Sequence, residues 1–131
     1  MRRRCLFLVT PPLATVDREL TAAQWSAVRD YSAMGYLVIP VVHPNGTSTP
    51  EERELLASVI AARTGARVPT VFEAGEGFDP RNVWDVARRF GLDLSRSILL
   101  THARTLAGLF HVAGVERVLS PTAGFGGMHA A

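Results

Sequence analysis

Short apolar runs alternate with longer amphipathic stretches along almost the whole chain. The clearest run, residues 36–42, contains no charged side chain, and the Tyr36 hydroxyl is its only side-chain polar group. The run has the length of a typical strand. An uninterrupted apolar run of this kind is typical of a strand that is covered on both faces of its sheet. The pattern predicts five strands, at residues 4–9, 36–42, 67–72, 97–101 and 115–119.

The stretches between the predicted strands carry the start and stop signals of helices. Thr21 and Thr49 are each followed three residues later by a Gln or a Glu, which is the spacing of a capping box. Asp79 and Pro80 form a third helix start, since Asp caps a helix and Pro suits its first turn. The signals predict helices that begin near residues 21, 49, 79 and 103 and end at the glycines at positions 35, 65, 91 and 114.

Strands that alternate with helices predict an α/β fold with a mainly parallel sheet. We expect a Rossmann-like three-layer sandwich of about five strands, with helices on both faces and a single domain over residues 1–120. Residues 121–131 are rich in glycine and small side chains, so we expect a flexible tail there. Phe125 and Met128 are the tail residues that could dock on the body or on a partner.

Charge and composition narrow the classes of partner. The formal net charge is only +2, every basic residue is arginine, and the cluster at residues 2–4 is larger than the whole excess. We expect a solvated, partly disordered start there, with a phosphate or nucleic-acid contact as the alternative. Aromatic residues do not interleave with the arginines, which argues against a nucleic-acid partner. No run reaches the roughly 20 apolar residues that span a bilayer, so we expect no membrane partner and a cytoplasmic protein.

The lone cysteine excludes an internal disulfide and a Cys-rich metal site within this chain. Cys5 lies in the first predicted strand, where we expect a buried and unreactive thiol. No cofactor and no metal are expected from the residues. Ligands of parallel α/β sheets bind beyond the carboxyl ends of the strands, which directs attention to residues 9–13, 42–46, 73–79 and 101–105.

Two stretches resemble a known family. MGYLVIPVVHPNG, residues 34–46, is similar to the second motif of the haloacid dehalogenase superfamily, in its heptose-bisphosphate and histidinol-phosphate phosphatase branch. DPRNVWDVARRFGLDLSRSILLTHARTLAGLFHVAGVERVL, residues 79–119, is similar to the third and fourth motif regions of that branch. The resemblance extends from Cys5 to Leu119 and implies a haloacid dehalogenase-like fold without a separate cap domain.

The resemblance also implies where catalytic residues should stand, and other residues occupy those places. FLVTPPL puts Val9 at the nucleophilic aspartate, Pro11 at the acid/base aspartate and Leu13 at the following threonine. Valine and proline side chains carry no atom that attacks phosphorus, and proline lacks an amide hydrogen. The remaining positions are Val42 for the phosphate-binding threonine, Gly77 for the lysine, and His102 and Leu106 for the metal-binding aspartates.

The resemblance together with these substitutions predicts a catalytically inactive pseudophosphatase that acts as a binding, scaffolding or regulatory protein. A protein partner or a second copy of the chain is the expected partner. A sensor of phosphate esters or nucleotides is the first alternative, and its candidate ligand residues are Thr10, His43, Asn45 and His102. A phosphatase or other hydrolase with non-standard catalytic residues is the second alternative.

Overall fold

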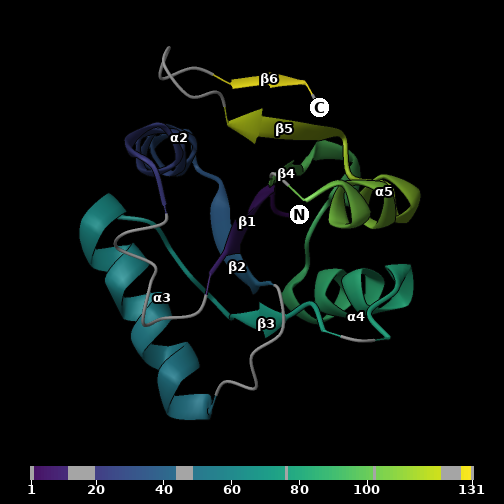
Figure 1. Cartoon of the computed structure of the whole chain (residues 1–131), viewed down its shortest axis with the longest axis horizontal. Coiled ribbons are helices and arrows are strands. Elements are labelled where there is room, and N and C mark those ends of the chain that lie inside the picture. The colour runs from purple at the N-terminus through teal and green to yellow at the C-terminus, as the bar shows by residue number, and fades with distance from the viewer. Residues whose placement is uncertain are drawn as a thin grey trace.

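The computed structural model describes residues 2–11, 20–43, 49–75, 77–101, 103–121 and 128–130. These residues form one six-stranded sheet in the order β3-β2-β1-β4-β5-β6 (Figure 1). The pairs from β3 to β5 are parallel and the last pair is antiparallel. The strands are β1 (Cys5–Thr10), β2 (Leu37–Val42), β3 (Phe72–Glu73), β4 (Ile98–Leu100), β5 (Arg117–Pro121) and β6 (Met128–Ala130).

Helices cover both faces of the sheet, which confirms the predicted α/β class and its three-layer, Rossmann-like arrangement. Figure 1 shows α2 and α3 on one side and α4 and α5 on the other. The helices are α2 (Ala22–Ala33), α3 (Pro50–Thr64), α4 (Pro80–Phe90) and α5 (Arg104–Ala113), and a 3-10 turn, η2 (Leu94–Arg96), precedes β4. None of the helices that the structure describes is both long and apolar enough to cross a membrane.

Local sequence signals explain where the helices begin. The side chains of Thr21 and Thr49 accept hydrogen bonds from backbone N–H groups three residues on, and the side-chain oxygens of Gln24 and Glu52 accept hydrogen bonds from the backbone N–H groups of the two threonines. Asp79 caps α4 in the same reciprocal way with Asn82. Such caps satisfy backbone donors that have no partner inside the helix, so the predicted starts agree with the observed ones to within a residue.

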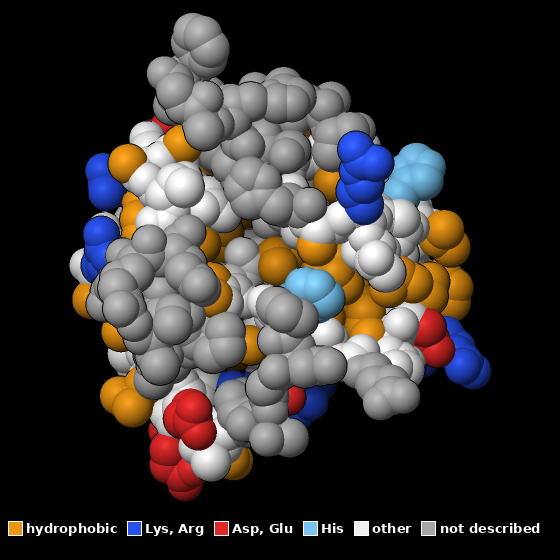
Figure 2. Space-filling model, viewed as in Figure 1, with side chains coloured by type: hydrophobic (Ala, Val, Ile, Leu, Met, Phe, Trp, Pro, Cys, Tyr) orange, Lys and Arg blue, Asp and Glu red, His pale blue; other side chains and the backbone are white. Residues whose placement is uncertain are grey.

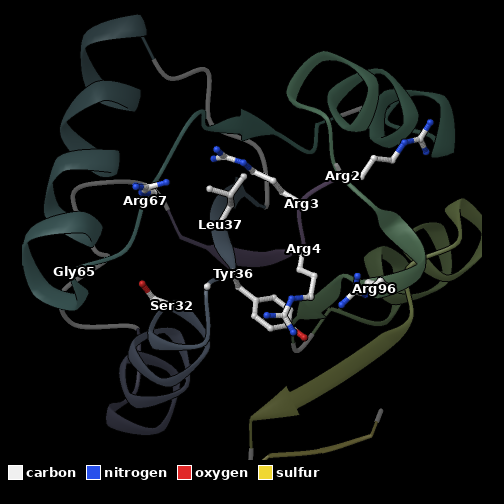
Figure 3. Close-up of a pocket in the computed structure, with 10 residues that line it drawn as sticks. Arg2, Arg3, Arg4, Ser32, Tyr36, Leu37, Gly65, Arg67 and Arg96 are labelled. Atoms are coloured by element: carbon white, nitrogen blue, oxygen red, sulfur yellow. The ribbon is translucent and has the colours of Figure 1, made fainter.

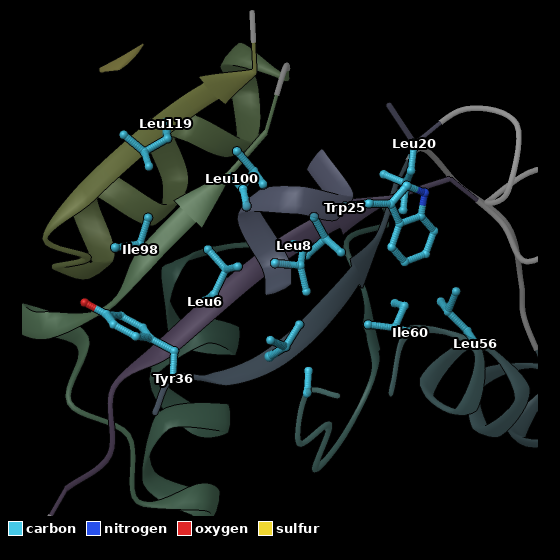
Figure 4. Packing of buried hydrophobic residues seen from close by; sticks show 14 of the residues in the cluster. Leu6, Leu8, Leu20, Trp25, Tyr36, Leu56, Ile60, Ile98, Leu100 and Leu119 are labelled. Atoms are coloured by element: carbon cyan, nitrogen blue, oxygen red, sulfur yellow. The ribbon is translucent and has the colours of Figure 1, made fainter. Parts of the chain in front are cut away.

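Alternation along the strands divides the buried residues into two cores. Leu6 and Leu8 of β1 face α2 and α3, whereas Cys5 and Phe7 face α4 and α5. The first core is shown in Figure 4, where Leu6, Leu8, Trp25, Leu56 and Ile60 are among the labelled residues. Each fully buried leucine or phenylalanine contributes about 1.5–3 kcal/mol through burial of its apolar surface. Both faces of β1 are therefore committed to packing, as expected for the central strand.

The two tryptophans lie on opposite sides of the sheet. Trp25 of α2 is 4 % exposed in the first core, and the Arg63 guanidinium lies 4.0 Å from the centre of its ring. Trp84 of α4 is 46 % exposed, and its Nε1 donates a 2.9 Å hydrogen bond to the carbonyl of Ala113 at the end of α5. Trp25 is therefore a packing residue of the first core, whereas Trp84 adds a polar link between two helices.

Two edges of the sheet differ from the prediction. The third strand was expected at residues 67–72 but pairs only as β3, Phe72–Glu73. The Arg67 carbonyl does accept a 2.9 Å hydrogen bond from the Val38 N–H, yet Pro69 has no N–H with which to extend the ladder. The tail, expected to be flexible throughout, contributes β6, which pairs Leu119 with Ala130 in antiparallel register. Phe125 lies outside the described residues.

Candidate functional site

The carboxyl ends of β1 and β4 meet where the strand order changes direction. β2 and β3 lie on one side of β1, and β4 and β5 lie on the other. In open parallel sheets a crevice forms at this point, because the connections leaving the two central strands go to opposite faces. The residues that end these strands or follow them are therefore the ones to compare with the predicted site.

The end of β1 presents one hydroxyl and two apolar neighbours. Val9 packs against the core under α4 and α5, and the partly buried Pro11 follows the strand. Thr10 shares the orientation of Leu6 and Leu8, toward α2 and α3, and is 1 % exposed. Its Oγ1 is buried and has no hydrogen-bond partner among the described residues. A buried hydroxyl without a hydrogen bond is unfavourable, so a ligand or water that bonded to Thr10 Oγ1 would stabilise this strand end.

His43 is tied to two neighbouring segments. Its backbone N–H donates a 3.0 Å hydrogen bond to the Thr10 carbonyl, which fixes the end of β2 beside the end of β1. Its Nδ1 lies 3.3 Å from the Ala74 carbonyl. A carbonyl can only accept, so in this contact Nδ1 is the donor. The ring is partly buried and is held in place beside the crevice.

Thr101 follows β4 and is a site residue that the sequence reasoning did not single out. It is 3 % exposed, and its Oγ1 accepts a 2.9 Å hydrogen bond from the Ala103 N–H at the start of α5. The signal was a threonine between an apolar strand and a helix, where a short side chain commonly satisfies a free backbone donor. Thr10 therefore ends β1 and Thr101 follows the neighbouring β4, and among the described residues the Thr10 hydroxyl has no partner whereas the Thr101 hydroxyl has one.

The other described motif positions, Val42, Gly77 and Leu106, place no polar side chain at the crevice. Val42 is 3 % exposed in the core under α2 and α3, and Leu106 is 2 % exposed in the core under α4 and α5. Gly77 is exposed and has a φ of 79°, a left-handed conformation that suits the turn before α4. Leu13, Asn45 and His102 lie outside the described residues, so their predicted roles stay predictions.

The charged residues beside the crevice are already engaged. Glu73 ends β3 and accepts a 3.0 Å ion-pair hydrogen bond from Arg53 of α3. Asp79 accepts from the backbone and the side chain of Arg81, and these bonds hold the pKa of its carboxyl below the ordinary value. Among the residues that the structure describes, no three His, Cys, Asp or Glu side chains lie together as a metal-binding group. In the view of Figure 2 the described charged side chains lie mostly near the outline, and hydrophobic ones are visible nearer the middle.

Comparison with known proteins supplies no family assignment. No family model matches the chain, and no curated protein was found to be similar to it. The resemblance to the haloacid dehalogenase superfamily therefore stays a prediction from sequence motifs, beside a fold that the structure shows directly.

Proposed function

We propose that this protein is a catalytically inactive, haloacid dehalogenase-like pseudophosphatase that works by binding. The proposal depends on one observation. At three positions where the resemblance expects a catalytic or ligand-binding side chain, Val9, Val42 and Leu106 pack as apolar side chains in the two cores. A position that serves as core packing offers no lone pair for attack on phosphorus and no oxygen for a hard cation.

The rest of the crevice supports the same proposal. Phosphoryl transfer depends on a positioned nucleophile and on charges that neutralise the phosphoryl oxygens. Thr10 has no base within hydrogen-bonding distance among the described residues, since its hydroxyl has no partner there. The carboxylate at the end of β3, Glu73, is paired with Arg53.

Turnover of phosphate esters tests the proposal. The purified protein is assayed with magnesium against a panel that includes heptose bisphosphate and histidinol phosphate, next to Val9→Asp. We expect no turnover from either, because one restored carboxylate replaces neither the missing metal-binding groups nor the missing lysine. Turnover that persists through several columns, falls in His43→Ala or His102→Ala, and is unchanged in His111→Ala would establish the hydrolase alternative instead.

A sensor of phosphate esters or nucleotides is the second candidate, and Thr10 favours it. The Thr10 hydroxyl is buried without a partner among the described residues, and the His43 imidazole lies at the end of the neighbouring strand, so a hydroxyl and an imidazole are both offered to a ligand. A ligand that binds only the folded state raises the apparent stability. A rise of the melting temperature with a phosphate ester, lost in both Thr10→Val and His43→Ala, would identify the sensor.

The proposed binding partner is a protein, a second copy of the chain included, and the proposed location is the cytoplasm. Four large apolar side chains are exposed among the described residues: Met34, Leu55, Trp84 and Val112. Trp84 and Val112 lie on α4 and α5, which pack against each other. Light scattering of the native protein and of Trp84→Gln with Val112→Gln tests the second-copy form: a dimer that dissociates in the variant supports it, and a monomeric native protein excludes it.

A further inference from the structure

Five arginines line one pocket at the amino ends of the strands, on the edge opposite to the crevice. The cavity has a volume of about 470 Å³, and its charged lining consists of Arg2, Arg3, Arg4, Arg67 and Arg96. Figure 3 shows the side chain of Arg3 extending toward Arg67, while Arg2 points away. Arg4 and Arg96 lie on the Tyr36 side of the pocket in the same view.

The strand order brings these arginines together from three places in the sequence. Residues 2–4 lead into β1, residue 67 precedes β3, and residue 96 precedes β4. Their backbones are held by hydrogen bonds: Arg3 donates to the Gly91 carbonyl at 2.8 Å, and the Arg67 carbonyl accepts from Val38 at 2.9 Å. The Arg96 N–H donates to the Asp93 carbonyl at 3.1 Å. The cluster is therefore built on a fixed frame.

The guanidinium of Arg4 is already bound to other parts of the described chain. Its Nη2 donates a 2.7 Å hydrogen bond to the Met34 carbonyl, and its guanidinium lies 4.5 Å from the centre of the Tyr36 ring. This stacking covers the aromatic face that could otherwise hold a base, which argues against a stacked nucleobase here. Arg2, Arg3, Arg67 and Arg96 are exposed.

The positive charge of the pocket is not neutralised by the described part of the chain. The ion pairs that the described residues form join Arg53, Arg81 and Arg88 to carboxylates, and none of these three arginines lines the pocket. No acidic residue lines the pocket either. The whole chain carries a net charge of +2, so the remainder outside the five arginines is net negative. The excess positive charge is therefore concentrated at one edge, where like charges repel unless an anion lies between them.

We infer that this arginine pocket binds a small anion with two or more linked phosphate groups. Guanidinium groups pair with phosphate oxygens through two parallel hydrogen bonds, and several guanidiniums favour a ligand with several charges. The volume lies within the range of small-ligand pockets. Guanidinium stays protonated throughout the working pH range, so the pH dependence of binding follows the ionisation of the phosphate.

Calorimetric titration with tripolyphosphate at about 0.15 M salt tests the inference, since salt at this level screens charges beyond roughly 8 Å. We expect saturable one-site binding that is tighter than binding of inorganic phosphate. Arg3→Gln with Arg67→Gln should raise the Kd about tenfold or more, because it removes two bidentate partners. The matched control, Arg29→Gln with Arg104→Gln, changes the net charge equally at exposed sites that do not line the pocket and should leave the Kd unchanged.

Three results would overturn the inference. Absence of saturable binding by the native protein excludes the site, and an equal loss in both double variants shows attraction by net charge alone. Tighter binding of a uridine 20-mer than of tripolyphosphate, weakened by Arg3→Gln with Arg67→Gln, assigns the pocket to RNA. Circular dichroism confirms that both variants are folded. Because this titration measures binding and the phosphate-ester panel measures turnover, failure of either leaves the other intact.

Discussion

At the scale of single residues, two threonines at the ends of neighbouring strands differ in how their hydroxyls are satisfied. Thr101 accepts a hydrogen bond from the Ala103 N–H, whereas Thr10 is buried with no partner in the described structure. A lost partner leaves a buried donor unsatisfied, but removal of an already unsatisfied hydroxyl relieves that cost. The two positions therefore respond oppositely to the same substitution.

Thr10→Val should raise the free energy of unfolding by about 1 kcal/mol, because valine keeps the shape of threonine and removes a buried, unpaired hydroxyl. Thr101→Val is the matched control and should lower it by about 1 kcal/mol, since the Ala103 N–H loses its acceptor. Urea denaturation followed by circular dichroism measures both. Destabilisation by Thr10→Val would mean that its hydroxyl has a partner, such as an ordered water, that stabilises the fold.

Some residues of the candidate site could be predicted from the sequence, and the arginines of the pocket could not. Motif comparison located Val9, Val42 and Leu106, and the alternation of β1 is enough to orient Thr10 toward α2 and α3. The arginine pocket could not be predicted, because Arg67 and Arg96 join residues 2–4 only once the order of the strands is known. Sequence spacing contains no direct signal of that order.

At the scale of elements, the helices were predictable because their ends are decided by neighbouring residues. A cap residue, its reciprocal partner and a terminal glycine all lie within one segment, as for α3 with Thr49, Glu52 and Gly65. The short strands β3 and β6 depend on a distant partner strand and on backbone pairing, to which side-chain patterns contribute little. This is why the errors lie at the two sheet edges.

The cap of α4 gives the fold a defined response to acid. Hydrogen bonds from the side chain and backbone of Arg81 lower the pKa of Asp79, so the folded state favours its carboxylate. That stabilisation is fully present above the unfolded-state pKa and is lost as the pH falls through the folded-state pKa. Asp79→Asn retains a capping oxygen without the charge.

We therefore expect the difference in urea midpoint between the native protein and Asp79→Asn to be constant near neutral pH and to shrink below about pH 4. Asp85→Asn removes one carboxylate from the same helix away from the cap, and its pH profile is subtracted as the control. A difference that stays constant down to pH 2 would contradict a role for the Asp79 charge in capping.

At the scale of the whole molecule, the lone thiol lies in the central strand and between the two helical layers. Cys5 is 0 % exposed, and burial raises the pKa of its thiol well above the ordinary value. Its backbone N–H donates a 3.0 Å hydrogen bond to Ser97 Oγ, which itself donates to the Asp93 carbonyl at 2.7 Å. The thiol therefore reaches solvent only when β1 separates from its neighbours, which confirms the prediction that it is buried.

Labelling of Cys5 by a thiol reagent across a urea series should follow the same transition as circular dichroism, because opening of the central strand requires unfolding of the whole domain. Ser58→Cys supplies the control, since this exposed residue of α3 should provide a second thiol that reacts at once without urea. Labelling of Cys5 at urea concentrations well below the unfolding transition would show that β1 opens by itself.

The placement of the two tryptophans on opposite faces of the sheet divides the intrinsic fluorescence of the protein between its two layers. Trp25 emits from the interior beneath α2 and α3, and Trp84 emits from a half-exposed position bonded to the end of α5. Single-tryptophan variants would thus report separately on the two layers. If the layers separate from the sheet at different times during unfolding, the two emission signals will change at different rates and resolve the order of events.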